Sequence, residues 1–367
     1  MITGIILAGG KSSRMGKEKG LVSFQGDFMI SHVIRNIRPI CNEIIICAND
    51  TGYNFLGYPV IPDEIRGSGP AGGILSGLKK SKNNKSLIIS CDLPHASTSF
   101  LREIYSRAEE YDIILCNQSD RLQPLCGIYD HIIAQKLEEM IRSGKRKMQD
   151  LVKSFNTRVL RQGDMTGYPF QYYLANFNAE EDVTRMNNPR IFLLTGPRNG
   201  GKSTYLAKMI DAFRLSDLKY AGIGTRAIYN DGNKTGFYLI NLENGQEEPL
   251  CTTTATPGWI GFGKFSFDQD VLKKGNQIIS SVSTSFNDLA IIDELGPMEM
   301  AGKGWRPGID KLLKNTDKKL LIVIRDEILT QSLAIFNDIP IRIINIRDEI
   351  TPEQASGLIV TAIGKGK

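Results

Sequence analysis

The chain has 367 residues, of which 41% are hydrophobic and 23% charged, and its formal net charge is +5. These values describe an ordinary folded protein of about two or three domains, and so small a net charge gives no indication of a nucleic-acid partner. The sequence contains no run of about 18 apolar residues and its opening "MITGIILAGG" has no basic leader, so we expect no membrane span, no signal peptide and a cytoplasmic protein.

Strand-like and helix-like segments alternate through the first half of the chain. Strands are predicted at residues 2–8, 42–49, 57–63, 86–92 and 112–117, with helices at 29–40 and 97–111. This alternation predicts βαβ units and a mainly parallel sheet. The polar stretch "NNPR" at 187–190 interrupts the pattern before a new apolar strand begins at Ile191, and we therefore place a domain boundary there.

The second half of the chain alternates in the same way. Strands are predicted at residues 220–226, 236–242, 264–268, 289–296, 320–326 and 341–346, and a closing helix at 351–364. We therefore expect two α/β domains with mainly parallel sheets, covering residues 1–186 and 190–367.

The first strand runs directly into a glycine-rich and basic loop, "LAGGKSSRMGKEKG". Open α/β folds bind ligands at the carboxyl ends of their strands, which is where this loop begins. Gly9 and Gly10 allow the backbone to approach a nucleotide, and the amides that follow can cradle phosphate oxygens. Arg14 and Lys19 supply positive charge suited to a triphosphate that loses pyrophosphate.

The pattern LAGGxSxRMGxxK resembles nucleotidyltransferases, and the later segments "ICAND", "SCDLP", "RLQPLCGIYD" and "LANFNAEEDV" make residues 1–186 most similar to the molybdenum cofactor guanylyltransferases. The resemblance implies a Rossmann-like nucleotidyltransferase fold that transfers GMP from GTP to molybdopterin phosphate and releases pyrophosphate. It assigns the phosphates to Leu7, Ala8, Gly9, Gly10 and Lys19, the nucleoside to Asn49 and Asp63, and Mg²⁺ to Asp92 and Asn178.

Asp92 is also expected in this role from its position, because a carboxylate that follows a buried strand lies where Mg²⁺ would bridge phosphate oxygens. A turn or helix-cap carboxylate is the alternative, and Asn49 and Asp63 taken alone could equally form local Asx turns. The chain departs from the family pattern at Glu18, where the family has aspartate, and at Ala179, where it has threonine. An exposed basic cluster at 145–147 is a candidate for the pterin phosphate or simply a solvated face.

A second glycine-rich loop, "GPRNGGKS", fits the P-loop pattern GxxxxGK[ST] between an apolar strand and a helical segment. Gly196, Gly201 and Lys202 would hold the phosphates of ATP or GTP, Ser203 would bind Mg²⁺, and Thr204 would line the same site. The apolar strand 289–292 ends in Asp293 and Glu294. Asp293 suits a contact to Mg²⁺, and Glu294 suits a residue that orients or deprotonates water.

Residues 190–367 are similar to a small P-loop nucleoside-triphosphatase family, through "GTRAIYNDGNKTGF" and "IDELGPMEMAGKGW". This resemblance brings Arg226 and Trp305 near the nucleotide, with Arg226 as a charge stabiliser.

The sequence leaves two alternatives open. The first domain could be a cytidylyltransferase acting on the same pterin, although "LAGG" favours guanine by resemblance. The second domain could be a nucleotide-dependent adaptor that docks the transferase onto a molybdoenzyme or an insertion protein, rather than a true hydrolase.

Overall fold

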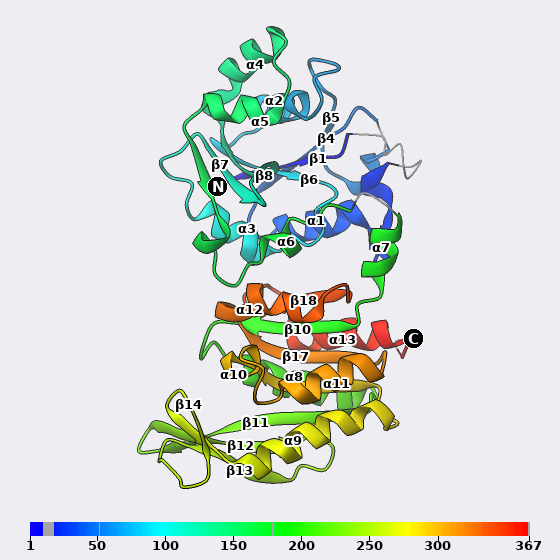
Figure 1. The fold of residues 1–367 in the computed structure, drawn as a ribbon. Helices are drawn as coiled ribbons and strands as arrows, with labels where there is room; N and C mark the ends of the chain where they lie inside the picture. Colours follow the sequence, from blue (N-terminus) through cyan, green and yellow to red (C-terminus); the bar gives the residue numbers. More distant parts are fainter. Residues whose placement is uncertain (10–17, 51, 178–179, 366–367) are drawn as a thin grey trace. The chain divides into compact units, whose positions relative to one another are not determined.

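The computed structural model describes residues 1–9, 18–50, 52–177 and 180–365. The chain separates into two compact units, Met1–Asn187 and Asn188–Lys367, and each is described here by itself. Both are α/β, so the predicted fold class is confirmed (Figure 1). We propose residues 1–186 and 190–367 as the functional domains within these units.

The first unit is built on a seven-stranded sheet in the order β5-β4-β1-β6-β8-β7-β9. Its strands are β1 (Thr3–Leu7), β4 (Glu43–Cys47), β5 (Val60–Ile61), β6 (Lys85–Ser90), β7 (Ile113–Gln118), β8 (Arg121–Asp130) and β9 (Thr157–Leu160). The four strands from β5 to β6 are parallel, whereas β8 runs antiparallel to both of its neighbours. A small hairpin of β2 (Ser23–Phe24) and β3 (Asp27–Phe28) stands apart.

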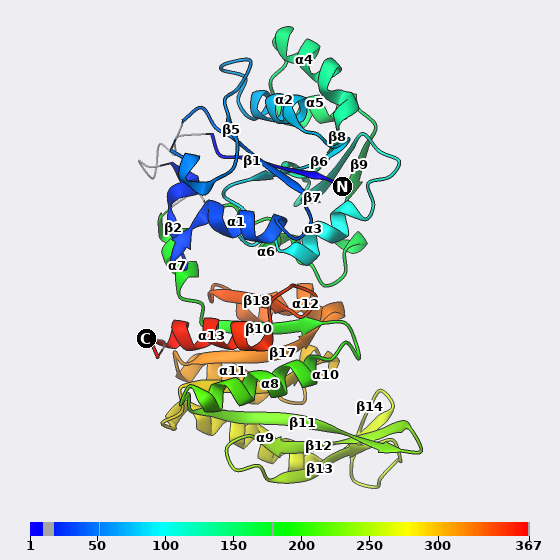
Figure 2. The same cartoon turned by 180° about the vertical axis from the view of Figure 1, so that it is seen from behind.

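Helices cover both faces of this sheet (Figures 1 and 2). They are α1 (Met29–Ile37), α2 (Pro70–Lys80), α3 (Thr98–Tyr105), α4 (Ala134–Arg142), α5 (Met148–Leu151), α6 (Phe170–Tyr173) and α7 (Glu180–Asn187). One core forms where α2, α4 and α5 pack on the sheet, and it includes Ile74, Leu78 and Leu137 against Ile5 and Ile88. Burial of these apolar side chains is the main stabilising contribution to this layer.

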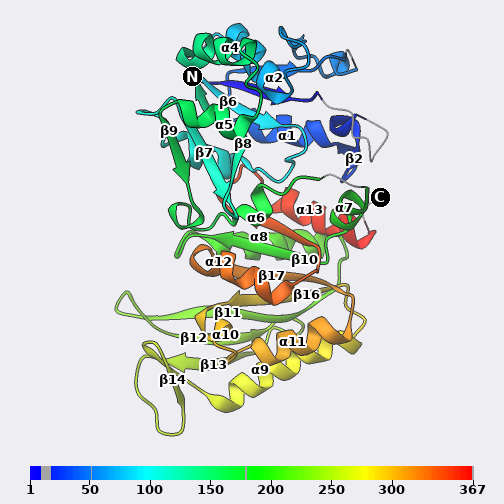
Figure 3. The ribbon, with the colours of Figure 1, turned by 45° about the horizontal axis from the view of Figure 1, so that its top comes forward.

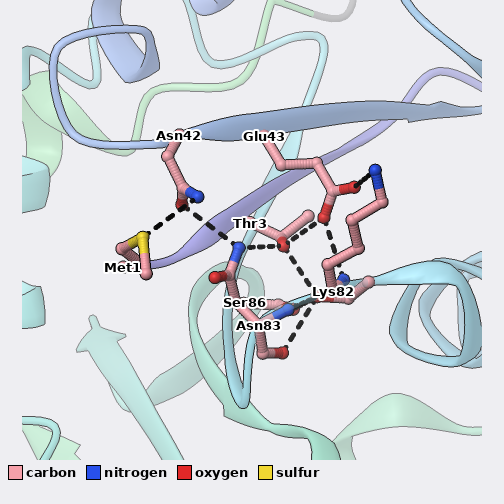
Figure 4. Close-up of polar contacts among 8 residues, drawn as sticks. Met1, Thr3, Asn42, Glu43, Lys82, Asn83 and Ser86 are labelled. Carbon is pink, nitrogen blue, oxygen red and sulfur yellow. Dashed lines mark hydrogen bonds and ion pairs between the residues drawn. The ribbon is translucent and has the colours of Figure 1, made fainter.

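A polar network fixes the amino end of β1 (Figure 4). The hydroxyl of Thr3, which is fully buried, donates to Glu43 Oε2 over 2.7 Å. The same hydroxyl accepts from Asn83 Nδ2 over 2.9 Å and from Ser81 Oγ over 2.7 Å. The network ties β1 to β4 and to the turn before β6, at the end of the strand opposite the glycine-rich loop. It therefore holds in register the strands that carry the candidate site.

The second unit is built on a nine-stranded sheet in the order β14-β15-β13-β12-β11-β16-β17-β10-β18. The five strands on one side are parallel: β11 (Tyr220–Asn230), β16 (Leu289–Leu295), β17 (Lys319–Arg325), β10 (Ile191–Gly196) and β18 (Ile341–Asn345). The other four form an antiparallel extension: β12 (Asn233–Asn241), β13 (Glu247–Thr252), β14 (Ile260–Phe262) and β15 (Phe265–Phe267). The sheet is thus parallel only in the part that carries the P-loop.

The helices of the second unit are α8 (Lys202–Leu215), α9 (Gln269–Ser281), α10 (Pro297–Met300), α11 (Arg306–Asn315), α12 (Asp326–Ser332) and α13 (Pro352–Ile363). α8 and α13 lie on one face of the sheet (Figure 2), where Leu206, Met209 and Ile359 pack on strand residues such as Leu194. α9 and α11 pack on each other (Figure 3), with Gly308 N donating to Asn276 Oδ1 over 2.7 Å. None of the helices in the described part of the chain has the length and apolar character needed to cross a bilayer.

Candidate active sites

The first candidate site lies where the connections of the first sheet change direction. β1 and β6 are neighbours, but the chain continues from β1 outward to β4 and β5, and from β6 it passes to the other side of the sheet. The loops that leave the carboxyl ends of β1 and β6 therefore diverge, and such switch points are where open α/β sheets bind ligands. Leu7 ends β1 here, Ala8 and Gly9 follow it, and Asp92 follows β6.

Lys19 and Asp92 meet at this point. Lys19 Nζ lies 3.2 Å from Asp92 Oδ2, and Asp92 is only 7% exposed. The other carboxylate oxygen, Oδ1, is buried and has no hydrogen-bond partner among the described residues. A buried carboxylate oxygen in this state calls for a donor or a cation. Asp92 therefore fits the part of a Mg²⁺ ligand.

Tyr53 anchors the loop that carries Lys19, and the sequence reasoning missed it. Its hydroxyl lies 3.1 Å from the carbonyl oxygen of Ala8 and 3.3 Å from Glu18 Oε2, and the residue is fully buried. A Cβ on Gly20 would come within 3.0 Å of the Tyr53 ring, so only glycine fits there without displacement. Burial raises the pKa of Tyr53 above its ordinary value, and the hydroxyl stays protonated as a donor. A lone tyrosine in a polar loop gave little signal.

Asn49 and Asp63 are brought together at the carboxyl ends of β4 and β5. Asn49 Nδ2 donates to Asp63 Oδ2, and the backbone N–H of Asp63 donates to Asn49 Oδ1, both over 3.0 Å. Asn49 is exposed and Asp63 is half-buried. Helix α2 lies close to Asp63 and Leu7 because residue 73 is glycine. A Cβ on Gly73 would lie 3.4 Å from Asp63 Oδ1 and 3.1 Å from Leu7 Cδ2. The pair places a half-buried carboxylate and an exposed amide at this edge of the sheet.

Three predicted residues of this site, Gly10, Arg14 and Asn178, lie outside the described residues. The segment before Asn178 does reach the site, because the backbone N–H of Phe177 donates to the carbonyl oxygen of Asp92 over 3.3 Å. The basic residues 145–147 are exposed, and Arg146 Nη1 donates to the carbonyl oxygen of Gly67 over 3.1 Å.

The second candidate site is the turn between β10 and α8. A Cβ on Gly196 would lie 2.4 Å from the Ile346 side chain, and Gly201 has a φ of +92°. Both positions therefore require glycine, for close approach and for backbone conformation respectively. Lys202 is 7% exposed, and its Nζ donates to the carbonyl oxygens of Gly196 (3.1 Å) and Pro197 (2.9 Å). Ser203 and Thr204 follow at the exposed start of the helix.

The acidic residues of this site end β16. Asp293 is 4% exposed, and Thr225 N and Oγ1 both approach its Oδ2 at 3.4 Å. Burial, chiefly, raises the pKa of Asp293 to about 7. A carboxylate desolvated to this degree is suited to a cation, which would favour its charged form. Asp293 therefore fits the part predicted for it toward Mg²⁺, and a role for Ser203 stays a prediction.

Arg325 and Asp326, where β17 meets α12, were not predicted from the sequence as site residues. Arg325 Nε donates to Glu294 Oε1 over 2.7 Å, and Arg325 Nη2 contacts the same oxygen. Asp326, the next residue, accepts from Thr195 Oγ1 over 2.8 Å and pairs with Arg347 over 2.5 Å. The available signal was an apolar strand that ends in an Arg-Asp pair, at 320–326.

Arg226 and Trp305 have other partners. Arg226 lies on β11, is exposed, pairs with Glu247 and stacks over the ring of Tyr238 at 4.6 Å. Side chains alternate between the two faces of a strand, so Arg226 points away from the face on which Thr225 meets Asp293. Trp305 is buried, and its ring occupies the space that a Cβ on Gly275 would need. A role at the nucleotide for Arg226 stays a prediction.

Comparison with known proteins assigns each part of the chain. Residues 4–160 match the family model described as "MobA-like NTP transferase domain", and residues 191–351 match the model described as "NTPase". A protein of Flavobacterium johnsoniae named "Probable molybdenum cofactor guanylyltransferase" is 36% identical over 187 residues, which is 51% of this chain and 96% of that protein.

Two solved structures are also similar. Molybdopterin-guanine dinucleotide biosynthesis protein A from Archaeoglobus fulgidus has 21% identity and a TM-score of 0.43, covering 50% of this chain and 96% of that one. A human cancer-related nucleoside triphosphatase has 20% identity and a TM-score of 0.36, covering 48% of this chain and 96% of that one. Given the sequence match over nearly the whole Flavobacterium relative, the chain belongs to the molybdenum cofactor guanylyltransferase family, and it carries in addition a segment that matches the NTPase family model.

Proposed function

We propose that the first unit transfers GMP from GTP to the phosphate of molybdopterin and releases pyrophosphate. The observation that carries the proposal is the pair of Lys19 and Asp92 at the switch point of the sheet, with one buried carboxylate oxygen of Asp92 left without a partner. Family membership supports the same reaction.

In the proposed reaction a phosphate oxygen of molybdopterin attacks the α-phosphorus of GTP. The bond between the α-phosphorus and the oxygen that bridges it to the β-phosphate breaks, and that oxygen leaves with pyrophosphate. Lys19, with Arg14 as predicted from the sequence, neutralises the charge that develops on the phosphate oxygens. Asn49 and Asp63 bind the nucleoside. Asp92 and Asn178 would hold Mg²⁺, which supplies further positive charge against the triphosphate when it is bound.

We propose that the second unit binds ATP or GTP at the P-loop and hydrolyses it. Lys202 and the amides between Gly196 and Gly201 would bind the phosphates, with Thr204 as a further contact, and Glu294 would orient the attacking water. Arg226 would join them only by leaving Glu247, with which it pairs. In the ligand-free loop, Lys202 is directed onto the carbonyl oxygens of Gly196 and Pro197, which phosphate oxygens would replace as its partners. We further propose that the protein acts in the cytoplasm and passes its product to a molybdoenzyme or an insertion protein.

The test of the transferase is the transfer of label from [α-³²P]GTP to molybdopterin by the full chain with Mg²⁺. Asp92→Asn should abolish the labelled dinucleotide. Asp120→Asn is the matched control, because Asp120 is exposed and has a left-handed φ of +59° that asparagine tolerates. Labelled product from Asp92→Asn at the rate of the control variant would contradict the proposed site.

A further inference from the structure

Arg325 occupies a position between the two halves of the P-loop site. It is the last residue of β17, which lies between β16 and β10 in the sheet. In the register of the strands, Arg325 pairs with Gly196, where the P-loop begins. On the other side, Asp293 and Glu294 lie near the carboxyl end of β16, whose last residue is Leu295. The backbone of Arg325 is therefore about one strand spacing from the start of the P-loop on one side and from the acidic residues of β16 on the other.

The side chain of Arg325 is directed at Glu294. Its Nε and Nη2 both contact a single oxygen, Glu294 Oε1. The two side chains are 30% and 26% exposed. Pairs this open to water contribute little to stability, so folding alone gives a weak reason for the arrangement. Glu294 is the residue proposed to orient water, so its partner lies at the reacting end of the site.

The charge of Arg325 also affects the pKa of Lys202. Burial has the largest effect on the pKa of Lys202 and lowers it, while Glu294 and Asp326 raise it and Arg325 lowers it. These groups therefore share one electrostatic environment around the P-loop. When a nucleotide binds, its γ-phosphate brings negative charge to the same place and competes with Glu294 for the guanidinium. A guanidinium matches phosphate in geometry as well as charge.

We propose that Arg325 is a catalytic residue supplied within the chain, whose guanidinium exchanges Glu294 for the γ-phosphate when the nucleotide binds. This inference rests on the hydrolysis proposed for the second unit. In the reaction a bond forms between the water oxygen and the γ-phosphorus, and the bond from that phosphorus to the β–γ bridging oxygen breaks. The electron pair stays on the nucleoside diphosphate, and the water proton passes to Glu294. Arg325 neutralises the charge on the transferred group, and its departure frees Glu294 for the water.

Two other arginines of this unit are committed elsewhere. Arg226 is paired with Glu247 and stacked on Tyr238 in the antiparallel extension. Arg347 pairs with Asp326, a residue only 3% exposed, and this buried carboxylate would be left uncompensated if the arginine moved away. Arg325 instead gives up a partly exposed pair, which costs little.

The test makes three measurements on the full chain. They are the rate of NTP hydrolysis, the affinity for Mg²⁺–NTP, and the increase in affinity for Mg²⁺–NDP when aluminium fluoride is added. Aluminium fluoride mimics the transferred phosphoryl group. Arg325→Gln should lower kcat by about 1,000-fold or more. Its NTP affinity should stay within about threefold of wild type, and the aluminium fluoride effect should be lost, because the contact is made in the transition state. Arg325→Lys keeps the charge without the planar fork and should fold and lose at least about tenfold in kcat.

Arg214→Gln is the matched control, because Arg214 is exposed on α8 and pairs there with Asp211. Hydrolysis by Arg325→Gln within about threefold of this control would overturn the role of Arg325 while leaving the NTPase intact. Equal losses of NTP affinity and kcat in both Arg325 variants would indicate a structural role and would also overturn the proposed catalytic role of Arg325. A wild-type chain that binds NTP but hydrolyses none would contradict the proposed NTPase function itself, and the catalytic role of Arg325 with it.

Discussion

Lys19 Nζ and Asp92 Oδ2 lie 3.2 Å apart, although 73 residues separate them in the chain. The contact exists because β1 and β6 are neighbours in the sheet, which brings together the loops that follow them. It joins a cation to a largely buried carboxylate at the place where the sheet is expected to bind its nucleotide. The transferase proposed for this unit depends on these two residues.

Removal of either residue should separate the two activities of the chain. Lys19→Ala and Asp92→Ala are expected to lower nucleotidyl transfer by at least about 100-fold, because each removes charge stabilisation of the reacting phosphates. NTP hydrolysis at the P-loop should stay within about twofold of wild type, since both substitutions lie in the other unit. Parallel assays of dinucleotide formation and phosphate release on one preparation would measure both. Loss of hydrolysis in a folded Lys19→Ala protein would contradict the separation.

Lys202→Ala should have the reverse effect. The substitution removes the cation of the P-loop, so phosphate release should fall by at least about 100-fold while nucleotidyl transfer is retained. Lys208→Ala, an exposed lysine on α8, serves as the matched control. If Lys202→Ala stopped transfer in a protein with an unchanged circular dichroism spectrum, the two sites could not be independent.

Tyr53→Phe should weaken the glycine-rich loop without touching the substrate. The single hydroxyl proton of Tyr53 is shared between the Ala8 carbonyl oxygen and Glu18 Oε2, and leaving a buried acceptor without a donor costs about 1–3 kcal/mol. We expect a lower free energy of unfolding in urea and a rise in the KM for GTP that exceeds the change in kcat. Tyr105→Phe, at a half-buried tyrosine of α3, should leave both unchanged. Equal free energies of unfolding and equal KM values for GTP in Tyr53→Phe and Tyr105→Phe would contradict the role of Tyr53.

Glu299 should make the stability of the second unit depend on pH. Burial is the main cause that raises the pKa of Glu299 from 4.5 to about 7, although its oxygens accept from the backbone of Gly296 and Trp305. Because the folded state favours the protonated form, the contribution of Glu299 is fully present below about pH 4.5 and is lost as the pH rises toward 7. The loss is up to about 3 kcal/mol.

The measurement is the free energy of unfolding between pH 5 and 8 for wild type and Glu299→Gln. Glutamine cannot titrate, so the free energy of unfolding of wild type should fall relative to that of Glu299→Gln as the pH rises. The exposed Glu109→Gln should run parallel to wild type. Parallel curves for Glu299→Gln would show that Glu299 is already ionised in the folded protein at pH 5.

The sequence predicted the parallel cores of both sheets well, because their strands are short apolar runs bounded by glycine and polar turns. It did not predict β8, which enters the first sheet antiparallel between β6 and β7. It also predicted a mainly parallel second sheet, whereas β12 to β15 form an antiparallel extension. Strand order and direction are set by long-range pairing, which local periodicity does not report.

The candidate sites also contain some residues that the sequence predicted and others that it did not. Lys19, Asp92, Lys202 and Asp293 could be named because their motifs carry strong local signals. Tyr53 and Arg325 could not, because each acts through a residue far away in the chain, Glu18 and Glu294 respectively. An isolated tyrosine or arginine carries no spacing that identifies such a partner. Their contacts depend on the folded arrangement of β-strands and loops.

Pyrophosphate release tests nucleotidyl transfer by the first unit most directly. It would be measured on the full chain with Mg²⁺ and each of the four NTPs, with and without molybdopterin. The Lys202→Ala variant would be used, because this substitution removes NTP turnover at the P-loop. Guanylyl transfer to the pterin predicts pyrophosphate from GTP alone and only when the pterin is present. Release from CTP would make the first unit a cytidylyltransferase, and absence of release with every NTP from a folded protein would contradict nucleotidyl transfer to this pterin.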